Sequence, residues 1–138
     1  MKNGFFLLLT ACFLLTTSCG KDEMPIKTPN ELAFDKIIGN WKSITHIEDG
    51  VDVTSDDAFT TFAYHQDSTF MGTINYGNGY IDEFDGTFLF LEEGLKLNLE
   101  YENSGGLAKY DVLELTETTM SLSINLFGTE SIAVYEKQ

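Results

Sequence analysis

The feature that most constrains the fold is an alternation of apolar and polar residues that begins after Gly39 and continues to residue 137. The alternation is clearest over 70–76, 95–101 and 120–126. Successive side chains of an extended strand point to opposite faces, so each of these segments predicts a strand with one buried and one solvated face. By the same pattern, strands are expected over 41–48, 59–65, 69–76, 80–84, 86–91, 95–101, 107–115, 119–127 and 131–137.

Short turn signals rich in Gly, Asn and Asp separate these strands at intervals of roughly ten residues. One of them, Asp85-Gly86, predicts a turn between 80–84 and 86–91. Sequential hairpins favour an up-and-down order, and closure into a barrel hides every strand edge. We therefore expect an all-β, antiparallel, up-and-down barrel of eight strands, with a sandwich as the alternative architecture. The interior of such a barrel is filled by side chains or holds one small ligand.

A short helix is expected before the first strand. Apolar residues over 31–38 recur at helical spacing, Thr28 or Asn30 can cap the segment in front, and Gly39 ends it. Only about two turns are available, so this helix must pack on another element to be stable.

The first 18 residues are typical of a cleaved targeting segment. Lys2 is followed by an apolar stretch of about ten residues, which is too short to span a membrane as a helix. The run Leu15-Thr16-Thr17-Ser18-Cys19 resembles the lipobox of bacterial lipoproteins, in which the cysteine becomes the lipidated first residue; a plain secretory signal with a chance cysteine is the alternative. The expected organisation is a signal peptide over 1–18, a tether over 19–30 and a barrel domain over 31–138.

The lipid anchor is supported by the cysteine count. Cys12 lies inside the apolar stretch and Cys19 is the only other cysteine, so cleavage leaves no second thiol for a disulfide or a metal cluster. The segment from Cys19 to Glu23 also resembles the surface-export signal of Bacteroidota lipoproteins. This resemblance implies an outer-membrane lipoprotein exposed at the cell surface, with the periplasmic face of that membrane as the alternative.

The formal net charge of −14, from 22 acidic residues against 8 basic ones, disfavours two classes of partner. Nucleic-acid binding depends on cationic side chains that neutralise phosphates, so a nucleic-acid partner is not expected. Direct binding to an anionic membrane surface is disfavoured for the same reason.

The tripeptide Gly39-Asn40-Trp41 stands between the expected helix and the first strand, where it resembles the Gly-x-Trp signature of lipocalins. Over roughly residues 34–138 the chain also resembles the short lipocalin-like domains of Bacteroidota lipoproteins. The other segments that carry this resemblance are 62–70, 110–122 and 135–137. It implies that Trp41 packs across the closed end of the barrel. Lipocalins commonly place an arginine over this tryptophan, and Lys137 is the cation of the last strand that could replace it.

No nucleophile elbow, phosphate-binding loop, zinc-ligand pair or dinucleotide-binding loop is visible in the sequence. His46 with Glu48 could form an acid–base pair, but a half-exposed strand histidine is the simpler reading. Asp56-Asp57 and the acids at 82, 83 and 85 lack the spacing of a calcium loop, and they are interpreted as solvated turns. We expect no catalysis, no metal and no cofactor, and no motif indicates an oligomeric state.

Aromatic residues spread over nearly every strand suggest a pocket in which tyrosine hydroxyls orient an apolar or amphipathic ligand. The expected ligand-contacting residues are Tyr64, Phe70, Tyr76, Phe88, Phe90 and Tyr110. The leading hypothesis is a non-catalytic, lipid-anchored protein that binds a small hydrophobic or amphipathic ligand in the barrel. The alternative is a structural or interaction lipoprotein with a filled barrel, whose loops contact a protein or glycan partner.

Overall fold

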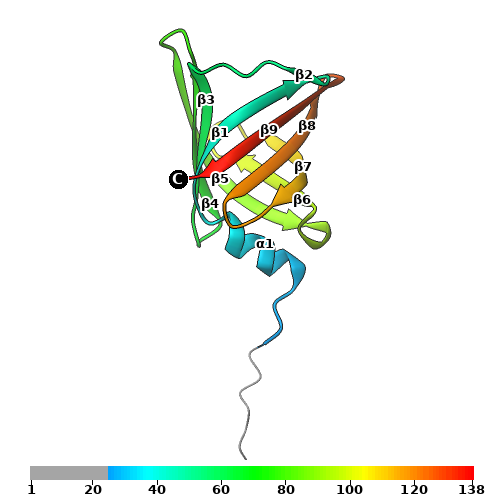
Figure 1. Ribbon diagram of the computed structural model, residues 1–138. Helices are drawn as coiled ribbons and strands as arrows, with labels where there is room; N and C mark the ends of the chain where they lie inside the picture. Colours follow the sequence, from blue (N-terminus) through cyan, green and yellow to red (C-terminus); the bar gives the residue numbers. More distant parts are fainter. Residues whose placement is uncertain (1–24) are drawn as a thin grey trace, which may run out of the picture.

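Eight antiparallel strands close into a barrel because the first strand pairs with the last (Figure 1). The structure is a computed structural model, and it describes residues 25–138. The strands are β1 (Gly39–Glu48), β2 (Val51–Asp52), β3 (Ala58–Tyr64), β4 (Thr69–Tyr76), β5 (Ile81–Leu91), β6 (Lys96–Tyr101), β7 (Leu107–Leu115), β8 (Thr119–Leu126) and β9 (Thr129–Lys137). Each long strand pairs with its neighbour in sequence, and the two-residue β2 only extends β1. The prediction of an up-and-down eight-stranded barrel is confirmed.

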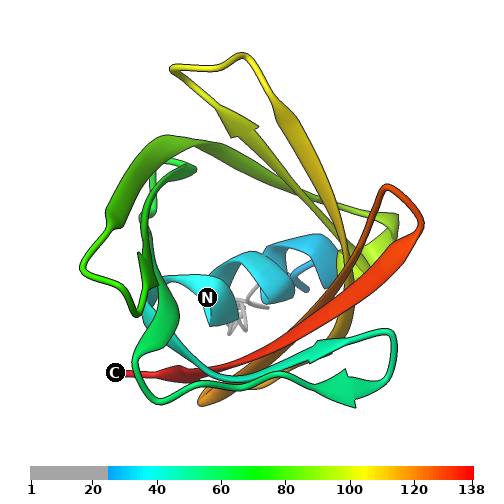
Figure 2. The ribbon, with the colours of Figure 1, turned by 90° about the horizontal axis from the view of Figure 1, so that it is seen from above.

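A short helix, α1 (Pro29–Ile37), precedes the barrel as predicted and lies across one end of it (Figures 1 and 2). Its start is held by a capping box: the Thr28 backbone N–H donates to Glu31 Oε2 at 2.7 Å, and the Glu31 N–H donates to Thr28 Oγ1 at 3.3 Å. The helix packs on the single turn η1 (Glu92–Gly94), where a Cβ on Gly94 would come within 2.9 Å of the Ala33 side chain. We call this the helix end of the barrel.

The turn predicted at Asp85-Gly86 is wrong. Both residues lie inside the continuous strand β5, where Gly86 pairs with Phe70 on one side and Tyr101 on the other. A Cβ on Gly86 would lie 1.9 Å from the backbone oxygen of Glu100. The glycine is therefore required by the close approach of two strands rather than by a change of chain direction.

The inward face of every long strand contributes to one core at the helix end. The buried apolar residues are Ile37, Trp41, Phe62, Tyr64, Phe70, Phe88, Phe90, Leu97, Leu99, Met120, Leu122 and Tyr135. Phe34 of α1 stacks on Phe88 with ring centroids 5.3 Å apart, so the helix is part of this core. The part of the chain that the structure describes includes no helix that is long and apolar enough to cross a membrane.

The opposite end of the barrel carries the connections 49–57, 77–80, 102–106 and 127–128, and we call it the open end (Figure 1). Inward positions near this end include small or polar residues, among them Ser43, His46, Ala58 and Thr60. The barrel is thus densely packed at the helix end and less tightly filled near the open end.

Candidate functional site

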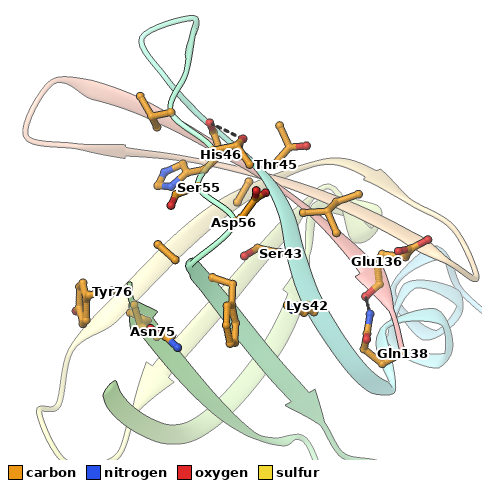
Figure 3. Close-up of a pocket in the computed structure, with 17 residues that line it drawn as sticks. Lys42, Ser43, Thr45, His46, Ser55, Asp56, Asn75, Tyr76, Glu136 and Gln138 are labelled. Atoms are coloured by element: carbon orange, nitrogen blue, oxygen red, sulfur yellow. Dashed lines mark hydrogen bonds between the residues drawn. The ribbon is translucent and has the colours of Figure 1, made fainter. Parts of the chain in front are cut away.

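A cavity of about 570 Å³ lies where β1 and β3 separate (Figure 3). These two strands pair only from Gly39–Lys42 against 61–64. Beyond Lys42, β1 continues along β9, and its register shifts between Ser43 and Thr45. Among the described residues, one side-chain hydrogen bond bridges the gap: the Thr60 N–H donates to Ser43 Oγ at 2.8 Å. The split in the barrel wall is therefore the space in which the cavity forms.

The cavity is lined by both apolar and polar side chains from four strands and from the segment 53–56, which we call the strap. The lining residues are Lys42, Ser43, Ile44, Thr45, His46, Val53, Thr54, Ser55, Asp56, Ala58, Phe59, Ile74, Asn75, Tyr76, Ala133, Glu136 and Gln138. Figure 3 shows the strap running past His46 while Tyr76 and Asn75 line the opposite side. A volume of this size with a mixed lining is typical of small-molecule sites.

The start of the strap is tied to β1. The His46 N–H donates to Thr54 Oγ1 at 2.9 Å, and the Val53 N–H donates to the His46 carbonyl at 2.9 Å. The Thr54 N–H donates to Asp52 Oδ1 at 2.9 Å. Hydrogen bonds from the Thr54 hydroxyl and backbone hold the pKa of Asp52 below its usual value. The wall of the cavity on this side is therefore built by defined contacts.

The His46 side chain lies at the cavity without forming a catalytic relay. Its Nε2 atom is 2.8 Å from Ser131 Oγ and 3.7 Å from Glu48 Oε1. A serine–histidine–acid relay needs the hydroxyl and the carboxylate on different ring nitrogens, because one nitrogen takes the hydroxyl proton while the other is held by the acid. Here both partners contact the same nitrogen, and the His46 and Glu48 side chains are about half exposed. The arrangement fixes the ring and does not activate the serine.

Several polar groups at the cavity make no side-chain contact within the described residues. Asp56 takes part in none of the hydrogen bonds or ion pairs found over residues 25–138. The hydroxyl groups of Thr45 and Tyr76 likewise form no hydrogen bond within these residues. Lys42, in contrast, places its Nζ 4.3 Å from the centroid of the Phe59 ring. The cavity thus offers unused hydrogen-bonding groups to a bound molecule, while Lys42 already covers one face of the Phe59 ring.

At the helix end, Gly39 and Trp41 join α1 to the barrel. Trp41 is fully buried, and its Nε1 donates to the Ile37 carbonyl at 2.6 Å. Lys137 Nζ lies 5.1 Å from the Trp41 ring and donates to the Lys36 carbonyl at 3.0 Å. Gly39 has a φ of +128°, and a Cβ there would come within 2.7 Å of Lys137 Cε, so the glycine leaves room for this lysine. Lys137 occupies the position expected for a cation above the tryptophan.

The aromatic residues predicted to contact a ligand fall into two places. Tyr64, Phe70, Phe88 and Phe90 are buried in the core at the helix end, and none of them lines the cavity. Tyr110 faces the interior opposite Leu97, and it does not line the cavity either. Tyr76 lines the cavity and is about half exposed. Cys19 lies outside the described residues.

Four tyrosines, which we call the interior tyrosines, share the inner space of the barrel: Tyr64, Tyr101, Tyr110 and Tyr135. Burial raises the pKa of each of these phenols. Tyr101 and Tyr110 each affect the pKa of the other, which places the two phenols near one another. Within the described residues, the buried Tyr64 hydroxyl has no partner.

A second hollow of about 460 Å³ lies on the outer face of β3, β4 and β5. Its rim includes Met71, Glu83 and Asp85, and Asn103 Nδ2 donates to Asp85 Oδ1 at 3.0 Å. Over residues 25–138, no group of three or more His, Cys, Asp or Glu side chains is arranged to hold a metal ion.

The sequence did not point to the cavity, because no motif marks its lining residues. One signal was available in the ten residues between the strands expected over 41–48 and 59–65, the longest gap between expected strands. Long connections in small barrels are often functional, and this one supplies the strap.

Comparison with known proteins identifies the fold. No protein-family model and no curated protein matches the sequence. Among solved structures, a lipocalin-like protein from Bacteroides uniformis matches with a TM-score of 0.55 and 15% identity, over 75% of this chain and 99% of that one. An uncharacterized protein from Bacteroides eggerthii matches with a TM-score of 0.53 and 18% identity, over 73% and 98%. The bovine lipocalin allergen Bos d 2 matches with a TM-score of 0.50 and 15% identity, over 76% and 75%. The barrel is lipocalin-like.

Proposed function

We propose that this protein is a non-catalytic binding protein that holds one small amphipathic molecule in the cavity between β1, β3 and the strap. The observation that carries the proposal is a ligand-sized cavity of about 570 Å³ in a barrel whose other half is packed. The lipocalin-like fold is consistent with this role. The ligand would lie beside the core rather than inside it.

The lining suggests how such a molecule would lie. Its apolar part would pack against Ala58, Phe59 and Ile74, which form an apolar face. Its polar part would face Asp56 and Tyr76, whose polar groups are unused in the described structure. An apolar body with one polar end satisfies both sides of the cavity.

Filling the cavity tests the proposal. Binding of phenylbutanol, a neutral amphipathic probe, would be measured by isothermal titration calorimetry on the purified protein, and native mass spectrometry would show any molecule that copurifies. Ala58→Trp should lower the affinity at least tenfold because the indole would occupy the cavity. Ala63→Trp is the matched control, since Ala63 lies on the same strand and faces the other side. Absence of binding by the unmodified protein, or equal affinities for both variants, would contradict the proposal.

We also propose that Cys19 carries a lipid that anchors the protein in the outer membrane, exposed at the cell surface. The pattern of Leu15 to Cys19 and the acidic residues after the cysteine support this proposal. Metabolic labelling with an alkynyl fatty acid should mark the protein, and Cys19→Ser should abolish the label. Digestion by a protease added to intact cells should remove the barrel; protection until the outer membrane is broken would assign the periplasmic face instead.

A second candidate function, contact with a partner protein through the open end, is favoured by one observation. Apolar side chains stand exposed on its loops and on the adjoining strand ends: Val51, Tyr80, Ile81, Leu126 and the fully exposed Phe127. Such side chains are common at interfaces. A photo-crosslinking residue at position 127 should then capture one protein in cells, and the same residue at Lys36, at the helix end, should not.

A further inference from the structure

We infer that the ligand of the cavity carries a positive charge and is an amphipathic organic cation, meaning an amine or a quaternary ammonium group on an apolar body. This inference rests on the proposed function, because it names the chemical class of the molecule held in the same cavity. It is carried by the charges around the open end, by the groups that line the cavity and by the places that the lysines occupy.

The open end carries charge of one sign only. The segments 48–58, 76–82, 101–107 and 126–130 contain no lysine and no arginine, so every charged residue in them is acidic. These acids are Glu48, Asp49, Asp52, Asp56, Asp57, Asp82, Glu102 and Glu130. The segments meet at one end of the barrel (Figure 1), so their fields add.

The lysines of residues 25–138 are placed elsewhere and are largely occupied. Lys27 pairs with Asp35 and Lys96 pairs with Asp111. Lys137 binds the end of α1, as described above. Lys42 lies at the edge of the cavity near β9 and is held over Phe59. Lys36 lies in the last turn of α1 at the helix end, and Lys109 lies on β7, two residues beyond the segment 101–107. Of the six lysines in the described part of the chain, only Lys109 therefore lies beside the eight acidic residues of the open end.

The cavity offers the two kinds of group that bind an organic cation. The Asp56 carboxylate supplies a negative charge that no described cation matches. Tyr76 supplies an aromatic face, and the Lys42–Phe59 contact shows an ammonium on an aromatic face in the same cavity. Figure 3 shows Asp56 and Tyr76 on two sides of the open space. A ligand ammonium group in that space would complement both.

A bare metal ion does not fit the same observations. No group of three His, Cys, Asp or Glu side chains converges within residues 25–138, although divalent cations need several ligands at short range. The acidic residues of the open end therefore set the sign of the field, and the cavity provides the binding site.

Three probes of nearly equal size separate charge from shape: phenylbutylamine, phenylbutanol and phenylbutyrate. Calorimetry on the purified protein at low ionic strength should give an affinity for the amine several-fold higher than for the alcohol, since an ion pair with the exposed Asp56 carboxylate adds about that factor. The acid should bind more weakly than the alcohol. High salt should reduce the advantage of the amine, because screening acts on the charges of the rim.

A pair of neighbouring variants locates the effect. Asp56→Asn should lower the affinity for the amine several-fold and leave the affinity for the alcohol unchanged. Asp57→Asn removes the same charge from the adjacent residue, which does not line the cavity, and should have a smaller effect on the amine.

Each outcome has one meaning. If the alcohol binds as tightly as the amine, the inference of a cationic ligand is wrong and the proposed function stands. If none of the three probes binds, the proposed function is contradicted as well. If the two variants weaken the amine equally, the role given to Asp56 is wrong. If oligolysine, which has no apolar tail, displaces the amine at equal concentration, the open end binds polycations and the assignment of a small ligand is wrong.

Discussion

Replacing Tyr64 with phenylalanine should make the protein more stable, although Tyr64 is one of its most buried side chains. The substitution removes one hydroxyl and keeps the ring, which lies 5.4 Å from the Phe62 ring and 5.0 Å from the Phe88 ring, centroid to centroid. The hydroxyl has no hydrogen-bond partner within the described residues. A buried polar group without a partner costs about 1–3 kcal/mol relative to water. We therefore expect the free energy of unfolding to rise by about 1–2 kcal/mol, since some relaxation lowers the cost.

The protein carries its own probe for this experiment. Trp41 is the single tryptophan and is fully buried in the same core, so its fluorescence reports urea unfolding directly. Ser43→Ala is the contrasting control: it also removes one hydroxyl, but that hydroxyl oxygen accepts a hydrogen bond from the Thr60 N–H at 2.8 Å. This control should lower the free energy of unfolding by about 1 kcal/mol. A loss of stability in Tyr64→Phe equal to that of the control would refute the reasoning, because it would mean that the Tyr64 hydroxyl is satisfied, for example by a buried water molecule.

Three further predictions test other parts of the barrel. Gly86→Ala should lower the free energy of unfolding by about 3 kcal/mol or more, because its Cβ would meet the backbone oxygen of Glu100 at 1.9 Å; a urea midpoint like that of the unmodified protein would contradict the packing described. Lys137→Met should cost about 1–2 kcal/mol through its contacts with Trp41 and α1, whereas Lys109→Met should cost less than about 0.5 kcal/mol in the same assay. Below about pH 10 the interior tyrosines should not change the free energy of unfolding. Above that pH the free energy of unfolding should fall, by up to about 1.4 kcal/mol per pH unit for each of Tyr64, Tyr110 and Tyr135. Burial raises their pKa in the folded state, so the unfolded chain loses these protons first; urea midpoints that stay constant well above pH 10 would contradict this.

The sequence was sufficient for the local parts of the fold. The capping residue Thr28 and the helical spacing over 31–38 predict a short helix from residues that are close together in the chain. The structure has this helix at Pro29–Ile37. Alternation predicted most strands because a closed barrel keeps one face of each strand buried throughout. Gly86 was misread because aspartate followed by glycine usually marks a turn, while its actual cause is the approach of Glu100 from another strand. A contact between residues so far apart in the chain leaves no local pattern.

The candidate site was harder to predict for a related reason. Alternation shows which face of a strand points inward, but it does not show how far along the barrel axis a residue lies. Phe70 and Tyr76 have the same inward phase on β4, yet Phe70 is buried in the core and Tyr76 lines the cavity. The cavity itself depends on the residue at which β1 stops pairing with β3, and that point is decided by the register of the whole barrel.

The pairing of β1 with β9 also has a kinetic consequence. It joins Trp41 to Lys137 and Glu48 to Ser131, so the barrel is closed by contacts between its earliest and latest strands. Contacts of such long sequence separation form late and slowly, because the loop between them must be ordered first. During folding, β9 must therefore pair with β1 before the barrel closes around Trp41. Until then the edges of β1 and β8 stay unpaired and open to association with other chains. In this protein the last strand sets the moment at which the chain stops being prone to aggregation.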